Sequence, residues 1–259
     1  EEFEKRRVEY EESLAKMEVP ALSQEMVKDS QARTEPFNSP AARDIERRAQ
    51  ELRDEQQPVE PLAKALAATL TAADASSHIG LLSVYEISKP TYYALKPEFR
   101  YRVLMDALSK AEVMNAWGVP HMFLTQPAAE AIICEGPAIE RYLYPVLDVN
   151  TETRVFGSSE VERYKPGDPH HYQVKDYALA LIFAVRGDRS FEIPGTREGR
   201  DGYIERIRKE AAGGSRAAPP SRDVARRGPT LPNCEPRGDA TQTPTQNAPA
   251  AQAAQAARK

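Results

Sequence analysis

Hydrophobic positions recur with a helical period at the start of the chain. In residues 1–17, four apolar side chains at spacings of seven, four and three form one narrow stripe: Phe3, Tyr10, Leu14 and Met17. This pattern predicts an amphipathic helix. A helix of this length with so narrow a stripe is marginally stable by itself in water. We therefore expect the stripe to need a covering surface, supplied by this chain or by another.

Three further segments have helical patterns with recognisable ends. Residues 39–58 begin with Ser39, a suitable N-cap residue, followed by proline at the first helical position. Residues 60–73 carry a wider apolar face, which predicts a buried helix. Residues 97–117 form a strong helical pattern, and Gly118 fits the left-handed C′ position, with positive φ, that ends a helix.

From residue 119 the pattern becomes irregular, with frequent proline and glycine between short apolar runs. These runs predict short strands at 121–124 and 191–193, a hairpin of 154–156 with 161–164, and helices at 137–143 and 200–212. Two longer runs, 79–87 and 176–185, fit either a helix or a buried strand, and length favours a helix for the second. The predicted fold class is α+β and predominantly helical, with a helical N-terminal region followed by a small mixed α/β portion.

The last fifty-odd residues differ from the rest of the chain. Residues 208–259 contain none of the 19 Phe, Tyr and Trp residues and only two large aliphatic side chains. Such a segment buries too little apolar surface to offset the loss of backbone entropy, so we predict a disordered tail. The predicted organisation is an extended amphipathic helical arm at 1–58, a globular α-rich core at 59–207 and a basic Ala/Pro/Gln-rich tail at 208–259.

Charge follows the same division. The net charge of −4 separates into about +5 on residues 208–259 and about −9 on residues 1–207. The acidic body argues against a general nucleic-acid surface, which needs clustered Lys and Arg. The longest apolar run, residues 177–185, is too short to span a bilayer, so no membrane insertion is expected. Two cysteines, Cys134 and Cys234, make no disulfide framework, which favours a reducing intracellular compartment, cytosol or organelle matrix.

Familiar catalytic and cofactor signatures are absent from the sequence. It contains no phosphate-binding G-x-x-x-x-G-K-[ST], no G-x-G-x-x-G after a strand, no G-x-S-x-G and no H-E-x-x-H. The residues most suited to transition metals, His121, Cys134 and the pair His170–His171, lack ligand spacing, so neither a metal nor a cofactor is expected. Cys134 lies in an apolar and acidic run that disfavours a thiolate, which predicts an unreactive core residue.

Aromatic residues are densest between residues 85 and 101. Tyr92 and Tyr93 belong to a cluster that also contains Tyr85, Phe99 and Tyr101, with lysines and arginines interleaved. Such a cluster is typical of core packing. It could also form a stacking surface for single-stranded RNA, or a surface for a protein partner.

These observations lead to one functional prediction with two alternatives. We predict a non-catalytic accessory or structural subunit that binds other protein subunits of an intracellular complex. The residues predicted to bind the partner are Phe3, Tyr10, Leu14, Met17, Tyr92 and Tyr93. One alternative is an enzyme without a readable motif whose site lies in 119–200, where a pocket gathering Asp148, Asp168, His170 and Asp176 would favour it. The other is an RNA-binding component of a ribonucleoprotein.

Overall fold

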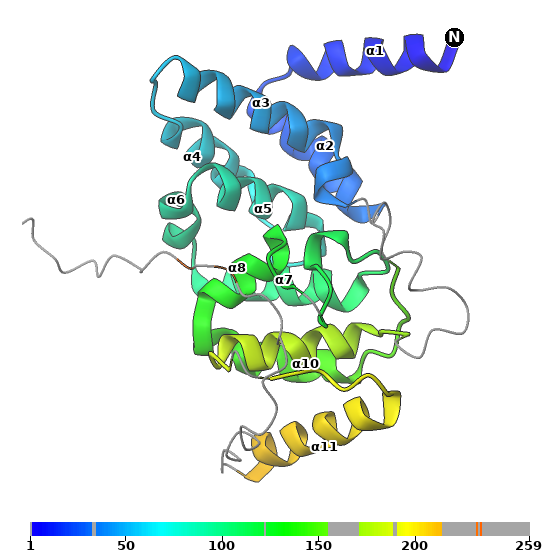
Figure 1. The fold of residues 1–259 in the computed structure, drawn as a ribbon. Coiled ribbons are helices and arrows are strands. Elements are labelled where there is room, and N and C mark those ends of the chain that lie inside the picture. Colours follow the sequence, from blue (N-terminus) through cyan, green and yellow to red (C-terminus); the bar gives the residue numbers. More distant parts are fainter. Residues whose placement is uncertain are drawn as a thin grey trace, which may run out of the picture.

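The chain folds as a helical protein. The structure, a computed structural model, describes residues 2–32, 35–121, 123–154, 171–188 and 191–213, together with Pro232 and Cys234. The α-helices are α1 (Glu2–Ala15), α2 (Val19–Gln31), α3 (Pro40–Asp54), α4 (Glu60–Thr69), α5 (His78–Ile87), α6 (Lys89–Ala94), α7 (Pro97–Lys110), α8 (Pro127–Glu135), α9 (Glu140–Leu143), α10 (Val174–Val185) and α11 (Arg197–Gly213) (Figure 1). Five short 3₁₀ helices join them: η1 (Pro36–Asn38), η2 (Ala75–Ser77), η3 (Asn115–Trp117), η4 (Gly136–Ile139) and η5 (Tyr144–Asp148).

Helix α5 lies at the centre of the upper half of the molecule. Every residue of α5 except Glu86 is buried, and the helix contacts α2, α3, α4, α6, α7 and α8. A short apolar run can be a helix rather than a strand when all its sides face protein. The ambiguous run at 79–87 is therefore a helix.

Helices α2 and α3 pack against this centre instead of projecting from it. Leu22 and Met26 of α2 and Ile45 of α3 are at most 1% exposed. The start of α3 is as predicted, because the Ser39 hydroxyl accepts a hydrogen bond from the Ala42 amide at 3.2 Å. Within the predicted arm at 1–58, only α1 extends away from the other helices (Figure 1).

The predicted helix at 97–117 is shorter than expected. Helix α7 ends at Lys110, and the chain then turns through η3, which buries Trp117 to 1% exposure. Gly118 does have the positive φ (74°) expected for its position, but it follows the 3₁₀ turn and not the helix. A Cβ atom there would lie 2.7 Å from the Phe123 carbonyl oxygen. This close approach, together with the positive φ, requires glycine.

The prediction of a mixed α/β portion from residue 119 is wrong. Among the described residues there is no sheet, and the only extended pairings are the isolated bridges Val113–Arg154, Val119–Phe123 and Glu152–Gln173. The predicted strand at 121–124 contributes only the isolated Val119–Phe123 bridge as far as it is described, whereas the segment at 137–143, predicted as a helix, is helical as η4 and α9. A short apolar run does not by itself specify a strand. Here α8, η4 and α9 pack on α10, all twelve residues of which are buried.

The remaining strand predictions have different outcomes. The segment at 191–193 is extended without strand pairing, and its Phe191 ring stacks on Phe183 with centroids 3.5 Å apart. The predicted hairpin lies outside the described residues, apart from Arg154. Helix α11 continues to Gly213, so helical structure passes the predicted start of the tail at residue 208. Beyond that helix only Pro232, which is buried, and Cys234 are described.

Buried side chains form one hydrophobic cluster that runs from Leu14 to Ile207. The predicted boundary at residue 58 therefore does not coincide with a break in the core. Helix α11 lies at the opposite end of the molecule from α1 and packs on α10 through Ile204 and Ile207 (Figure 1).

Candidate functional site

The stripe predicted on the first helix is only partly available to a partner. Leu14 is 1% exposed and Met17 packs partly buried against the core. Tyr10 is 39% exposed, and its hydroxyl donates a 3.3 Å hydrogen bond to Glu25 of α2. The side chain of Phe3 lies outside the described residues. The inner end of the stripe, Leu14 and Met17, is thus covered by this chain itself, whereas Tyr10 is exposed.

The base of α1 is held by an arginine of α3. The Arg48 guanidinium donates to the carbonyl oxygens of Leu14, Ala15 and Met17 at 3.1, 3.2 and 2.8 Å. Asp44, one turn earlier, holds the same guanidinium at 2.7 Å. Terminal carbonyls of a helix lack intrahelical partners, and a cation at that end also complements the helix dipole. Arg48 therefore fixes the end of α1 from which the rest of the helix projects.

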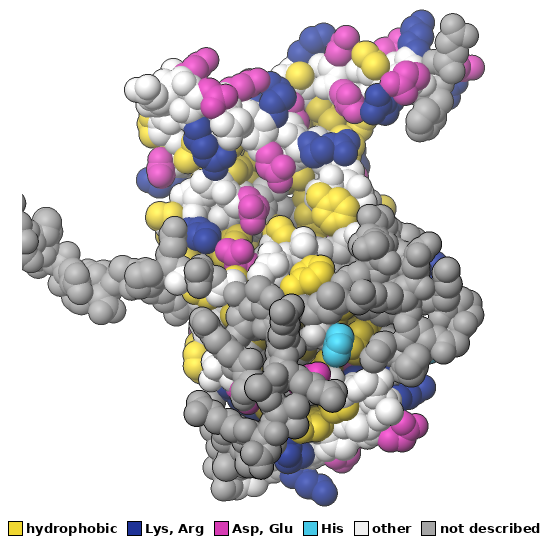
Figure 2. All heavy atoms as spheres, viewed as in Figure 1, with side chains coloured by type: hydrophobic (Ala, Val, Ile, Leu, Met, Phe, Trp, Pro, Cys, Tyr) yellow, Lys and Arg dark blue, Asp and Glu magenta, His cyan; other side chains and the backbone are white. Residues whose placement is uncertain are grey.

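The projecting part of α1 is exposed on all sides. Every described side chain from Glu4 to Glu12 is exposed, including Val8 at 43%. Figure 2 shows charged side chains of both signs along this helix, with hydrophobic ones between them. A groove of about 240 Å³, the α1–α3 groove, runs between the two helices and is lined by Glu11, Leu14, Ala15, Pro40, Arg43, Asp44 and Arg47.

The two tyrosines predicted to bind a partner belong mainly to the core. Tyr92 is 0% exposed and Tyr93 is half-buried, and their rings meet edge to face at 5.2 Å. Tyr85 and Tyr101 are also buried, at 1% and 4%. The Arg100 guanidinium lies 5.0 Å from the Tyr92 ring centre inside this cluster. Nucleic-acid bases stack on accessible rings, so the cluster does not provide the surface that suggested RNA binding.

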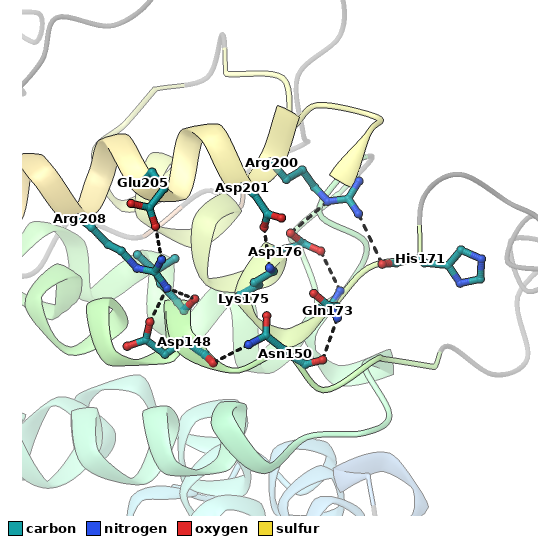
Figure 3. Close-up of polar contacts among 11 residues, drawn as sticks. Asp148, Asn150, His171, Gln173, Lys175, Asp176, Arg200, Asp201, Glu205 and Arg208 are labelled. Atoms are coloured by element: carbon teal, nitrogen blue, oxygen red, sulfur yellow. Dashed lines mark hydrogen bonds and ion pairs between the residues drawn. The ribbon is translucent and has the colours of Figure 1, made fainter. Parts of the chain in front are cut away.

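The acidic residues considered for catalysis are engaged in structural contacts. Asp176 is 1% exposed and forms a 3.0 Å ion pair with Arg200, which is equally buried (Figure 3). Its other carboxylate oxygen accepts the Gln173 amide at 2.8 Å and so caps the start of α10. Burial raises the pKa of Asp176, and the Gln173 amide and Arg200 oppose that shift.

Asp148 belongs to a different ion pair. It is exposed and contacts Arg208, eight residues beyond Arg200 on α11 (Figure 3). Eight residues of helix span roughly 12 Å, so α11 holds the two aspartates apart. Asp168 and His170 lie outside the described residues. Asp148 and Asp176, the two described acids of the proposed set, thus do not converge.

The two cysteines form a disulfide. The Sγ atoms of Cys134 on α8 and Cys234 are bonded, with their Cα atoms 5.2 Å apart. Disulfides persist in oxidising compartments. The expectation that Cys134 and Cys234 make no disulfide is wrong, and cysteine usage no longer argues for a reducing compartment.

A cavity of about 370 Å³ lies where α2, η2, the start of α5 and the end of α7 meet. We call it the Trp117 cavity; its lining consists of Ser30, Gln31, Glu35, Pro36, Asp74, Ala75, Ser76, His78, Ala107, Lys110, Ala111, Glu112, Val113 and Trp117. The turn η2 contacts both α2 and α7. Asp106 of α7 holds η2 in place by accepting the Ala75 amide at 2.8 Å.

Two titratable side chains are buried against consecutive residues of η3 in this cavity. The Glu35 carboxylate, in a residue 8% exposed, accepts the Ala116 amide at 2.9 Å. The His78 ring, also in a residue 8% exposed, stacks on Trp117 with ring centres 5.3 Å apart and planes 6° from parallel. Burial raises the pKa of Glu35 to about 7 and lowers the pKa of His78 to about 4. The imidazole is therefore neutral at pH 7, and the carboxyl group is half ionised.

Sequence analysis did not identify Glu35, His78 or Trp117 as a site. They come from three separate segments and carry no motif spacing. The one available signal was His78, which directly precedes the ambiguous run at 79–87. A histidine beside an apolar run is commonly a core residue.

No family model, curated protein sequence or solved structure matches this chain. Across the described ranges, no group of three or more His, Cys, Asp and Glu residues is placed to hold a metal ion. Within the same residues, no helix combines the length and the apolar character needed to cross a membrane.

Proposed function

We propose that this protein is a non-catalytic accessory or structural subunit, and that α1 is the element by which it joins another protein of a larger assembly. One observation supports this proposal above the others. The described side chains from Glu4 to Glu12 are all exposed, while Leu14 and Arg48 anchor the base of the same helix. An anchored helix that leaves its outer turns uncovered is suited to docking on a second surface.

The distribution of apolar side chains indicates the shape of that surface. Val8 and Tyr10 are two positions apart, which places them roughly 200° apart around the helix. A flat surface would cover only one of them. The partner we propose therefore encloses α1 in a groove with apolar walls, in the manner of helix-in-groove recognition.

Ion pairs along α1 stabilise it as a helix before it binds. Arg6 contacts Glu2, Arg7 contacts Glu4, and Lys5 lies 3.8 Å from Glu9. Exposed pairs of this spacing stabilise a helix weakly but additively. A helix that is already formed loses less conformational entropy when it binds.

The two alternatives receive no comparable support. For an enzyme site within 119–200, the two described acids of the expected pocket, Asp148 and Asp176, have separate arginine partners. An RNA-stacking surface lacks accessible rings at Tyr85, Tyr92 and Tyr101. We therefore propose neither.

The intracellular compartment predicted from the sequence loses its argument, because Cys134 and Cys234 are bonded and disulfides persist in oxidising compartments. The proposal therefore includes no compartment.

Site-specific photo-crosslinking tests the docking role of α1. A photoreactive phenylalanine analogue replaces Val8 in the full-length chain, in cells of origin that produce it. Phe37 is the matched control position, because it is similarly exposed (44%) but lies on η1. We expect one discrete adduct with another protein from position 8 and none from position 37, and Tyr10→Glu should remove the adduct. Equal adducts from both positions, or an adduct made of two copies of this chain, would contradict the proposal.

A further inference from the structure

The Trp117 cavity contains a buried polar atom without a partner. Among the described residues, the Nε2 atom of His78 makes no hydrogen bond, although the residue is only 8% exposed. Buried polar atoms are nearly always paired, because leaving one unpaired is costly. Close by, Glu35 accepts a hydrogen bond from the Ala116 amide. A carboxylate has about four acceptor positions, so this contact leaves acceptor capacity at the inner wall of the cavity.

The charges around the cavity are mainly acidic. Asp74 and Glu112 are exposed and lie in the lining together with the buried Glu35. Lys110 is the lining residue of opposite sign, and its ammonium group is already paired with Asp106 at 2.7 Å. A ligand that complements this lining is positively charged and donates hydrogen bonds.

We propose that the Trp117 cavity binds a small aliphatic ammonium cation, and that a diammonium ion binds most tightly. One ammonium group donates to the Glu35 carboxylate and to Nε2 of His78 at the buried end. The second lies beside the exposed carboxylate of Asp74. The aliphatic chain contacts the apolar lining, which includes Ala107 and Ala111.

The volume fits a ligand of this kind. At about 370 Å³ the cavity is near the lower end of small-molecule sites, which cover roughly 300–1,000 Å³. This proposal is independent of the docking role of α1, because α1 contributes nothing to the cavity lining.

Trp117 provides a direct readout, because it is the single tryptophan of the chain. Full-length protein is titrated with 1,4-diaminobutane, butylamine, butanol and butyrate while tryptophan emission is recorded, and the thermal midpoint is measured in parallel. We expect saturable changes in emission, a raised midpoint with the two amines, tighter binding of the diamine, and no response to butanol or butyrate. Absence of any response to the amines, or an equal response to butanol or butyrate, would overturn the proposal.

Substitutions identify the site. Glu35→Gln should weaken diamine binding at least tenfold, and His78→Phe should weaken it while keeping a ring against Trp117. The matched control is Glu46→Gln, which changes another carboxylate whose pKa is raised by burial, but on α3 and outside the cavity. The control should bind as the unmodified protein does. Retained affinity in Glu35→Gln, or equal loss in the control, would assign binding to another place and overturn the proposal.

The pH dependence gives an additional test. The titratable and charged groups that line the cavity with Glu35 are Asp74, His78, Lys110 and Glu112. Because burial raises the pKa of Glu35 to about 7, the binding carboxylate is mostly protonated at pH 6. Diamine affinity should therefore be about tenfold lower at pH 6 than at pH 8.5, and Glu35→Gln should remove this difference. An unchanged pH profile in that variant would contradict the role of Glu35.

Discussion

Burial of Glu35 predicts that this one side chain destabilises the fold as the pH rises. Its pKa is about 7 in the folded protein and 4.5 ordinarily, and burial is the cause. Below pH 4.5 the carboxyl group is protonated in both the folded and the unfolded chain, so its titration does not change the free energy of unfolding. Between pH 4.5 and 7 the unfolded chain loses this proton while the folded chain retains it, so stability falls as the pH rises. Above pH 7 this decrease in the free energy of unfolding is complete and amounts to about 3 kcal/mol.

Glu35→Gln isolates this contribution. The glutamine side-chain oxygen can still accept the Ala116 amide, but the side chain cannot ionise. Urea unfolding of both proteins is measured between pH 4 and pH 9, and the free energies of unfolding are subtracted to cancel every other titrating group. We expect the variant to gain about 3 kcal/mol relative to the unmodified protein between pH 4 and pH 8. A difference that stays constant with pH would refute the reasoning and show that Glu35 is hydrated in solution.

Three further predictions concern other parts of the fold. Arg100→Met should lower the free energy of unfolding in urea by about 3–5 kcal/mol, because it removes the positive charge paired with the buried Glu135 carboxylate. Adding Glu135→Leu should restore most of the loss, and a double variant no more stable than the single one would contradict this. Gly118→Ala should lower the free energy of unfolding more than Gly136→Ala does. Both residues have positive φ, which costs about 1–2 kcal/mol for alanine. Of the two, only Gly118 would place the new Cβ against a backbone oxygen. Equal losses would show that the Gly118 turn relaxes. Arg48→Ala should increase amide hydrogen exchange in α1 and leave α5 unchanged, and an increase in both helices would mean that Arg48 stabilises the whole core.

The start of α3 and the conformation of Gly118 could be predicted from the sequence, because a local signal determines each of them. Ser39 and Pro40 marked the start of α3, and the capping hydrogen bond is present. Gly118 was expected to have a positive φ, and it does. Both outcomes depend on the conformational preferences of one or two residues, which do not change much with tertiary context.

The same reasoning was wrong where packing decides the outcome. Short strands were expected at 121–124 and 191–193, but the described residues there join no sheet, and helices pack on the buried α10 instead. Residues 1–58 were expected to form an extended arm, yet α2 and α3 within that range pack on α5. Pairing between distant residues was also missed, as with Cys134 and Cys234, which are 100 positions apart.

The Trp117 cavity illustrates why sites of this kind escape sequence analysis. Glu35, His78 and Trp117 are about forty positions apart in sequence, and each is unremarkable in its own segment. Their chemistry arises from shared burial beside η3. Burial depends on how α2, α5 and α7 meet, and no local pattern specifies that meeting.

The central claim is that the outer turns of α1 are uncovered in the free protein and covered in an assembly. Amide hydrogen exchange of the purified full-length chain, compared with the same chain isolated in its complex, measures this directly. We predict fast exchange from Glu4 to Glu12 in the free protein, slow exchange in α5, and strong protection of the α1 residues in the complex. Exchange in α1 as slow as in α5 without any partner, or α1 exchange unchanged in the complex, would contradict the account.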